Sequence, residues 1–169
     1  VIPFMRSSRN SDDFATTADV IHEVLECYRA KGREFEYACC VYPTAPLIER
    51  DQLQKAFDLL VEQNYTSVFP VVRFSYPIWR SLRISEDGKM VMNWPEYEKS
   101  RSQDLPAAYH DAGQFYWLWI EHFLREKKLF SSNSGSIILN DMQVQDIDNL
   151  DDWKMAELKI KLKQGDNPA

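Results

Sequence analysis

Apolar residues recur at helical spacing in several parts of the chain. The first periodic stretch follows Thr16 and Thr17, either of which can cap a helix, and Gly32 supplies its stop. Its apolar face is formed by Val20, Ile21, Val24, Leu25 and Tyr28. Residues 49–64 form the clearest amphipathic pattern, with a buried stripe of Leu53, Ala56, Phe57, Leu60 and Val61. The pattern predicts helices over both stretches.

Between and after these stretches lie short runs in which most residues are apolar. Residues 35–42 and 66–72 have this composition, which is typical of strands buried on both faces of a sheet. A strand, a helix and a strand at this spacing predict a right-handed parallel crossover, and therefore an α/β fold.

The second half of the chain adds further elements. Residues 111–119 and 136–139 are predicted strands, and residues 120–128 a predicted helix. Asn149 or Asp151 can cap a last helix, and we expect the polar residues 164–169 to fray.

Residues 75–110 break the alternation of strands and helices. They contain three prolines, two tryptophans and a turn at residues 86–89. We interpret them as a hairpin followed by an extended excursion. A long insertion in an α/β domain is typically a lid or a partner-binding arm, although a plain surface loop is the competing interpretation.

Composition and charge indicate the size of the domain and exclude some classes of binding partner. The chain has 169 residues, 44% of them hydrophobic, which suits one domain with a real core. The net charge of −6 and the absence of a basic run argue against nucleic-acid binding. No apolar run reaches transmembrane length. Cys27, Cys39 and Cys40 lack disulfide or zinc-site spacing, so we expect reduced thiols in a cytoplasmic protein.

The strongest local signal for chemistry is a pair of aspartates before the last helix. Asp146 and Asp148 stand two residues apart, so in an extended segment both carboxylates point to the same side. Two hard oxygen ligands at this spacing suit Mg²⁺ or Mn²⁺. The alternative is that this acidic segment only solvates a loop, with helix capping by the nearby Asn149, Asp151 and Asp152. An acidic protein with anionic substrates would need such an ion, or a local cluster of cations.

Two further segments are candidate binding elements. Residues 42–47 form a Pro-Thr-Ala-Pro turn after a predicted strand, where Tyr42, Thr44 and backbone amides are available to a ligand. Residues 111–116 combine Gly113, which permits close approach of the backbone, with a hydrogen-bonding amide and two aromatic rings. The candidate ligand-binding residues here are Gln114, Phe115 and Tyr116. A plain turn and an ordinary core strand are the competing interpretations.

Three other residues could face a ligand. Arg6 and Arg73 are candidate anion clamps, although a lone arginine is usually a surface residue. His110 is a weaker candidate because it precedes Asp111. The chain contains no nucleophile elbow, no Walker loop and no GxGxxG, which fits direct displacement rather than covalent catalysis.

Taken together, these motifs resemble the acylneuraminate cytidylyltransferase family, and within it the pseudaminic acid branch. The resemblance is carried by Pro3-Phe4-Met5-Arg6 with Asp12-Asp13-Phe14, by residues 42–47, by residues 111–116 and by Asp146-Ile147-Asp148. It implies a Rossmann-like α/β fold, with a mostly parallel sheet flanked by helices in a single domain over residues 1–169. Residues 75–110 would be an inserted arm that packs against the second subunit of a homodimer.

The resemblance also implies a reaction and its residues. CTP and an acidic nine-carbon sugar would give a CMP-sugar and pyrophosphate. Asp146 and Asp148 would hold Mg²⁺ at the CTP phosphates, and Arg6 would lie near the nucleotide. Thr44, Gln114, Phe115 and Tyr116 would line the sugar site.

Two departures from the family pattern shape this interpretation. Tyr42 and Ala45 replace the usual Gln and Ser, which favours pseudaminic acid over sialic acid. The chain begins at Val1 without the family's phosphate-binding loop, so we expect the 169-residue piece alone to be inactive. A sialic, legionaminic or Kdo cytidylyltransferase remains an alternative, as does a non-catalytic sugar-binding or dimerisation module.

Overall fold

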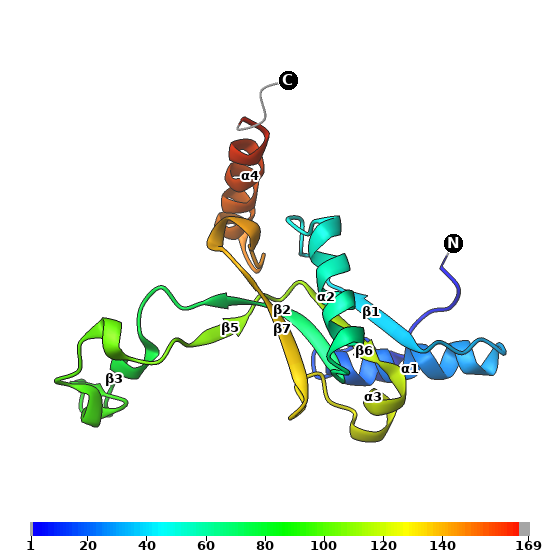
Figure 1. The fold of residues 1–169 in the computed structure, drawn as a ribbon, viewed down its shortest axis with the longest axis horizontal. Helices are drawn as coiled ribbons and strands as arrows, with labels where there is room; N and C mark the ends of the chain where they lie inside the picture. The colour runs from blue at the N-terminus through cyan, green and yellow to red at the C-terminus, as the bar shows by residue number, and fades with distance from the viewer. Residues whose placement is uncertain (1, 166–169) are drawn as a thin grey trace.

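A mixed β-sheet lies at the centre of the protein with helices on both of its faces (Figure 1). The structure is a computed structural model that describes residues 2–165; residues 166–169 of the tail that we expect to fray lie outside the described part. The helices are α1 (Thr17–Ala30), α2 (Arg50–Glu62), α3 (Ile120–Glu126) and α4 (Leu150–Gly165). The strands are β1 (Tyr37–Val41), β2 (Ser67–Arg73), β3 (Leu82–Ile84), β4 (Met90–Met92), β5 (Tyr109–Asp111), β6 (Phe115–Trp119) and β7 (Ser134–Leu139).

The predicted helices form where their caps and periodicity place them. The side chain of Thr16 accepts a hydrogen bond from the backbone N–H of Asp19, and the carboxylate of Asp19 accepts the bond back from the Thr16 backbone. This capping box satisfies free N–H groups at the start of α1. The helix ends at Ala30, and Gly32 follows with φ +70, a conformation that favours glycine.

The expectation of a mostly parallel sheet is wrong. Strand β6 lies between β1 and β2 and is antiparallel to both, and β5 is also antiparallel to β2. Only β7 pairs with β2 in parallel. Because β1 and β2 are both antiparallel to β6, they run in the same direction, as the crossover pattern predicts, but they do not pair. The fold is α/β with a mostly antiparallel sheet.

Alternation along the strands explains how both faces of the sheet are buried. Cys39 packs in the core cluster beneath α2, whereas its neighbour Cys40 packs on the opposite face with α1 and α3. In the same way Phe115 faces α2 and Tyr116 faces the other side. Burial on both faces produces continuous apolar runs whatever the direction of the strands. The apolar runs therefore predict buried strands correctly and leave their order undetermined.

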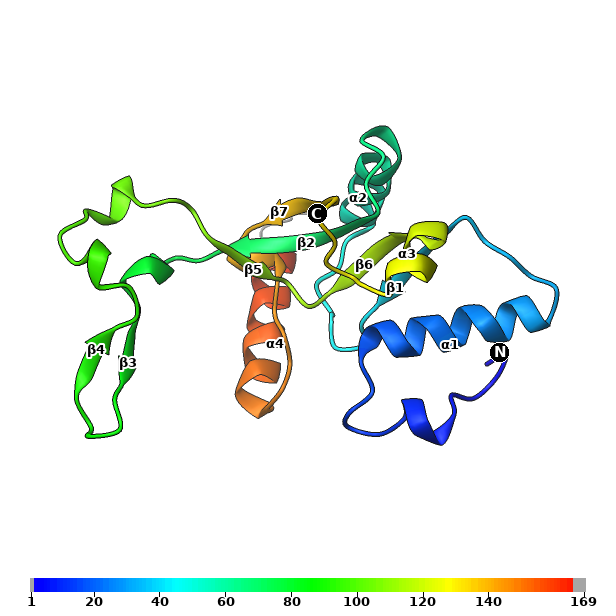
Figure 2. The same ribbon diagram turned by 90° about the horizontal axis from the view of Figure 1, so that it is seen from below.

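Between β2 and β5 the chain leaves the sheet and forms a long projection, which we call the arm (residues 74–108) (Figure 2). Its outer part is the antiparallel pair β3–β4, in which Ile84 stands opposite Met90. The indole N–H of Trp79 donates to the carbonyl of Pro106 at 2.9 Å, which ties the outgoing and returning segments of the arm together. Within residues 2–165, no helix is both long enough and apolar enough to cross a membrane.

Candidate active site

Four segments with candidate residues meet at one edge of the sheet. Strands β1, β2 and β7 run in the same direction, so their carboxyl ends lie at the same edge, and β6 begins there because it runs the opposite way. Ligands of α/β proteins collect beyond the carboxyl ends of such strands. The turn after Tyr42, the side chain of Arg73, the Gly113 turn and the loop after β7 all fall at this edge.

Pairing of β7 with β2 brings two charged residues from distant parts of the chain to the same place. Val72 pairs with Leu139, the last residue of β7. Arg73 and Asp141 follow just beyond this pair, and both line one cavity at the base of the arm. The guanidinium and the carboxylate have no hydrogen bond or ion pair recorded within the described part of the chain. They are charged groups that remain available to a ligand.

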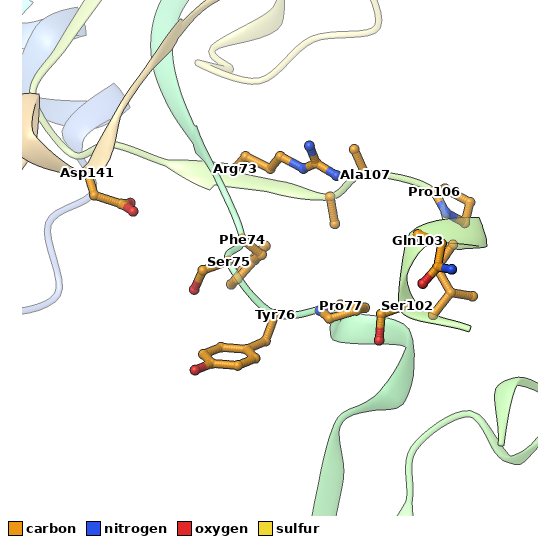
Figure 3. A pocket seen from close by; sticks show the side chains of 12 residues that line it. Arg73, Phe74, Ser75, Tyr76, Pro77, Ser102, Gln103, Pro106, Ala107 and Asp141 are labelled. Atoms are coloured by element: carbon orange, nitrogen blue, oxygen red, sulfur yellow. The ribbon is translucent and has the colours of Figure 1, made fainter. Parts of the chain in front are cut away.

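This first cavity, the arm cavity, is lined by residues 73–77, 102, 103, 105–108 and 141 and has a volume of about 570 Å³. Figure 3 shows Arg73 along one wall, Asp141 on another with its carboxylate directed inward, and the ring of Tyr76 at the rim. A volume of this order accommodates a drug-sized or sugar-sized ligand.

A second cavity, the edge cavity, adjoins the first. It is lined by residues 72, 110–112, 141, 144–146 and 159 and has a volume of about 370 Å³. Three of its side chains are the carboxylates of Asp111, Asp141 and Asp146. His110 also lines it, so the structure places this weaker candidate beside the aspartates. Asp141 is the one described residue that lines both cavities.

Asp111 is held in place by two hydrogen bonds. The hydroxyl of Tyr116 donates to Oδ2, and the backbone N–H of Gly113 donates to Oδ1 at 3.2 Å. Burial, and then the bond to Asp111, raise the pKa of the Tyr116 hydroxyl above its usual value, so this group remains a donor. Tyr116 is itself buried. The structure therefore presents it as a support for Asp111.

The Gly113 turn also meets Asp146. Gly113 has φ +62, and a Cβ atom built on it would lie 3.6 Å from Oδ2 of Asp146. This is an ordinary contact distance, so space does not require glycine here, whereas the positive φ would strain any other residue. Gly113 therefore serves the turn that brings residues 111–114 beside Asp146.

The first residues of α4 are capped without help from Asp146 or Asp148. Oδ1 of Asn149 accepts from the N–H groups of Asp151 and Asp152, at 2.9 and 3.1 Å. Oδ2 of Asp152 accepts from the N–H groups of Asp148 and Asn149, at 3.2 and 3.1 Å. Asn149 is the cap, as one of the two sequence alternatives has it. Capping by Asn149 and Asp152 agrees with the alternative interpretation, in which nearby residues cap the helix, and it leaves Asp146 and Asp148 outside the cap.

These two carboxylates have the donor chemistry that a divalent cation requires. Asp146 is exposed and lines the edge cavity, and within residues 2–165 its carboxylate accepts from one donor, the adjacent N–H of Ile147, at 3.1 Å. Asp148 is exposed but does not line that cavity. The expectation that both carboxylates face one cavity is therefore met by Asp146 and not by Asp148. Mg²⁺ is typically held by one or two carboxylates together with water and substrate phosphates, which a single carboxylate in the cavity can still satisfy. No group of three or more metal-binding side chains occurs among the residues that the structure describes.

One cation borders the acidic side chains. The ammonium group of Lys159, on α4, donates to the carbonyl of Val144 at 2.6 Å and to Oε1 of Gln145 at 3.0 Å. Burial lowers the pKa of Lys159, and the nearby charge of Asp141 opposes this effect. Lys159 therefore fastens α4 to the segment that precedes Asp146 and adds positive charge to the edge cavity.

Tyr42 connects the first turn to the same network. Its hydroxyl lies 2.5 Å from the hydroxyl of Thr17, and its ring packs against Tyr116 with centroids 5.4 Å apart. Thr44 is exposed in the turn that follows. The structure thus places the 42–47 turn next to the Tyr116–Asp111 pair.

Seven of the predicted site residues line neither cavity: Arg6, Tyr42, Thr44, Gln114, Phe115, Tyr116 and Asp148. Phe115 is buried in the core beneath α2. Gln114 is 1% exposed, and its amide donates to the carbonyl of Gln143 at 2.8 Å, while its oxygen has no partner among the described residues. Arg6 lies on the exposed N-terminal segment near Glu23 of α1. Of the predicted site residues, Arg73 lines the arm cavity and Asp146 the edge cavity. Tyr116 supports Asp111 of the edge cavity, and Tyr42 packs on Tyr116.

Comparison with known proteins gives a consistent family. The chain is 34% identical to the pseudaminic acid cytidylyltransferase of Campylobacter jejuni serotype O:2 over 160 residues, which covers 95% of this chain and 69% of that protein. It is 33% identical over 152 residues, 89% of the chain, to a Helicobacter pylori protein named as pseudaminic acid cytidylyltransferase and UDP-2,4-diacetamido-2,4,6-trideoxy-beta-L-altropyranose hydrolase, of which it covers 29%. An N-acylneuraminate cytidylyltransferase of Danio rerio is 29% identical over 159 residues, which covers 92% of the chain and 35% of that protein. No protein-family model matches.

The chain belongs to the pseudaminic acid cytidylyltransferase family. The resemblance carried by the sequence motifs is confirmed. Two cavity residues of this cytidylyltransferase family member are not singled out by its sequence. Asp141 is a lone acid in a loop, and Lys159 is one of several lysines on α4. The only usable signal for Asp141 is that it follows a predicted strand.

Proposed function

We propose that the protein transfers CMP from CTP to pseudaminic acid, a nine-carbon acidic sugar, and releases pyrophosphate. The observation that carries this proposal is the 34% identity to a pseudaminic acid cytidylyltransferase over 95% of the chain. The geometry supports it, because the sheet edge offers two adjoining cavities, one beside an unpaired arginine and one beside aspartates.

The two cavities suit two different substrates. Arg73 in the arm cavity is a permanent positive charge that suits the carboxylate of the sugar, because a guanidinium group binds a carboxylate through two parallel hydrogen bonds. Tyr76 and the apolar side chains of that cavity suit the N-acyl and methyl groups of the sugar. The edge cavity, with Asp146 and Lys159, is our site for the nucleotide phosphates.

Asp146 and Asp148 are our candidate ligands for Mg²⁺ or Mn²⁺. A bound divalent ion would neutralise charge on the phosphates and on the departing pyrophosphate. The protein's own part is to present two carboxylates that are free of helix-capping bonds. Tyr116, Asp111 and the Gly113 turn fix the wall next to Asp146. Tyr42 and Thr44 extend the site toward the first turn.

A homodimer through the arm is part of the proposal. A two-stranded hairpin is marginally stable by itself and needs a further surface to pack on. One face of β3–β4 exposes Leu82, Ile84 and Met90, which are 54%, 71% and 60% accessible. Self-complementary apolar faces of this kind pair across a two-fold axis. We therefore assign this face to a second copy of the chain.

We place the protein in the cytoplasm. Cys27, Cys39 and Cys40 are free thiols. Burial raises the pKa of Cys39 to about 12, which keeps that thiol protonated and unreactive. Unpaired thiols fit a reducing compartment.

The proposal is tested by pyrophosphate release from the protein that the complete gene encodes, with CTP and Mg²⁺. The sugars to compare are pseudaminic, sialic, legionaminic and Kdo acids at equal concentration. We expect the highest kcat/KM with pseudaminic acid. A higher kcat/KM with another of these acids would assign that acid as the substrate. Absence of pyrophosphate release with all four acids would overturn the proposed activity.

A further inference from the structure

Asp141 occupies the boundary between the two cavities. It is the one described residue that lines both, and Figure 3 shows its carboxylate directed into the arm cavity. In the proposed reaction the sugar hydroxyl must approach the α-phosphorus of the nucleotide. The reacting hydroxyl therefore has to lie where a sugar in one cavity meets a phosphate in the other, and that place is beside Asp141.

The chemistry of the sugar narrows its position further. Its carboxylate and its anomeric hydroxyl are attached to the same carbon atom. A cation that binds the carboxylate therefore also fixes the hydroxyl within a few ångströms. Arg73 is the arginine of the arm cavity, and strand pairing holds it beside the loop of Asp141 through the Val72–Leu139 pair.

Asp141 is also free to accept a proton. Its carboxylate has no hydrogen bond or ion pair recorded among residues 2–165. The preceding Asn140 caps the short 3-10 turn, since its side chain accepts from the N–H of Met142 at 3.0 Å. The turn therefore does not require the Asp141 side chain for its own stability. A carboxylate within reach of the proton to be removed is a suitable general base.

We propose that Asp141 is a catalytic residue that accepts the proton of the anomeric hydroxyl as the sugar attacks. This inference rests on the proposed function. The O–H bond of the sugar breaks and its proton passes to a carboxylate oxygen of Asp141. The sugar oxygen forms a bond to the α-phosphorus, and the bond from the α-phosphorus to pyrophosphate breaks, with the electron pair leaving on pyrophosphate.

Several charged or titratable groups surround this carboxylate and set its environment. They are Arg73 of β2, His110 and Asp111 of β5, Asp146 of the loop and Lys159 of α4. A pH profile must therefore be compared between variants that differ only at Asp141.

The test measures single-turnover formation of the CMP-sugar in Asp141→Asn and wild type, with the protein of the complete gene. We expect a rate about 100-fold lower, in the range that general-base catalysis contributes, with KM for CTP and sugar within about 3-fold. The wild-type rate should fall at acid pH, and Asp141→Asn should lack that fall. Asp141→Gly should recover activity with added formate, whereas Asp58→Asn, an exposed change on α2 outside both cavities, should match wild type.

Three results would overturn the assignment while leaving the proposed function intact. The first is a wild-type rate in Asp141→Asn. The second is a slow variant that keeps the acid fall and gains nothing from formate. The third is a more than 10-fold rise in the Mn²⁺ concentration for half-maximal rate, which would make Asp141 an ion ligand. Failure of the proposed function would instead appear as no CMP-sugar from wild type.

Discussion

The hydroxyl of Tyr116 donates a hydrogen bond to Oδ2 of Asp111, and this bond fastens a carboxylate of the edge cavity to the core of the sheet. Tyr116 packs with Phe69 and Val71, so its own position is fixed by the core. The arrangement gives Tyr116, an aromatic residue of the 111–116 motif, a supporting position behind the cavity wall.

Tyr116→Phe should keep the packing and remove only this bond. Because the acceptor is a carboxylate, we expect the free energy of unfolding to fall by roughly 1.5–3 kcal/mol at neutral pH. Urea denaturation of both proteins measures the change. We also expect kcat/KM to fall, since Asp111 loses one of its two anchors. Unchanged stability would mean that solvent replaces the bond at no cost.

The same variant tests a pH effect whose sign follows from the raised pKa of Tyr116. The usual pKa of tyrosine is 10. Below that pH, Tyr116 is protonated in both the folded and the unfolded protein, and its contribution to the free energy of unfolding is fully present. Above that pH the unfolded chain loses the proton while the folded one keeps it, so stability declines. Burial also raises the pKa of Cys39, which adds a decline of the same sign. The difference between wild type and Tyr116→Phe at pH 8 and pH 10.5 isolates the tyrosine.

Local signals in the sequence predict the four helices and the strands β1, β2 and β7, but not the order of the strands. The predicted strand over residues 111–119 is wrong in its first part, because a turn at Gly113 separates β5 from β6. The capping box at Thr16 and the stripe on α2 act within a few residues, so they can be read from the chain. The position of β6 between β1 and β2 depends instead on the arm, which reverses the chain before β5. Such a long-range pairing leaves no periodic mark in the sequence.

The residues of the candidate site also fall into those that local sequence signals indicate and those that only the tertiary structure reveals. Asp146 and Asp148 are predicted by their spacing, and Gly113 by its conformational freedom, because both are local properties. Asp141 meets Arg73 only because β7 pairs with β2 in one register. Whether Gln114 lies in the core or in a cavity depends on which face of β6 is covered, and composition alone does not decide this.

Removal of either proposed ion ligand should strongly reduce turnover without unfolding the protein. For Asp146→Ala and Asp148→Ala we expect kcat/KM to fall by about 100-fold or more, at or beyond the upper end of what loss of an outer-shell partner costs a metal site. Binding of Mn²⁺, followed by electron paramagnetic resonance, should weaken in both. The matched control is Asp151→Ala, which removes an exposed carboxylate paired with Lys154 on the same helix. Full activity in Asp146→Ala would remove the metal assignment.

A charge placed on the apolar face of the arm should disrupt assembly. We expect Ile84→Glu to shift the protein from dimer to monomer at micromolar concentration, because burial of an unpaired carboxylate at an interface is costly. Size-exclusion chromatography with light scattering measures the mass. Glu86→Lys is the control, since it changes charge at the exposed hairpin turn and leaves the apolar face intact. A monomeric wild type would contradict the dimer proposal.

Gly135 provides a test of the sheet itself. It pairs with Val68 on β2, and the ring of Tyr65 covers its Cα so closely that an added Cβ would overlap two ring carbons. Gly135→Ala should therefore lower the free energy of unfolding by about 1–3 kcal/mol, the usual cost of overpacking. Gly165→Ala, at the end of α4 where a Cβ meets nothing within 4 Å, should not destabilise the protein.

A double-mutant cycle separates this steric clash from a general effect of alanine on β7. Tyr65→Ala by itself should destabilise, because the ring packs against the core beneath α2. In that background Gly135→Ala should cost little, because the atoms that it would strike are gone, and the two changes should couple by at least about 0.5 kcal/mol. Additive losses in urea denaturation would show that the ring does not lie over Gly135, and the parallel register of β7 on β2 would then need revision.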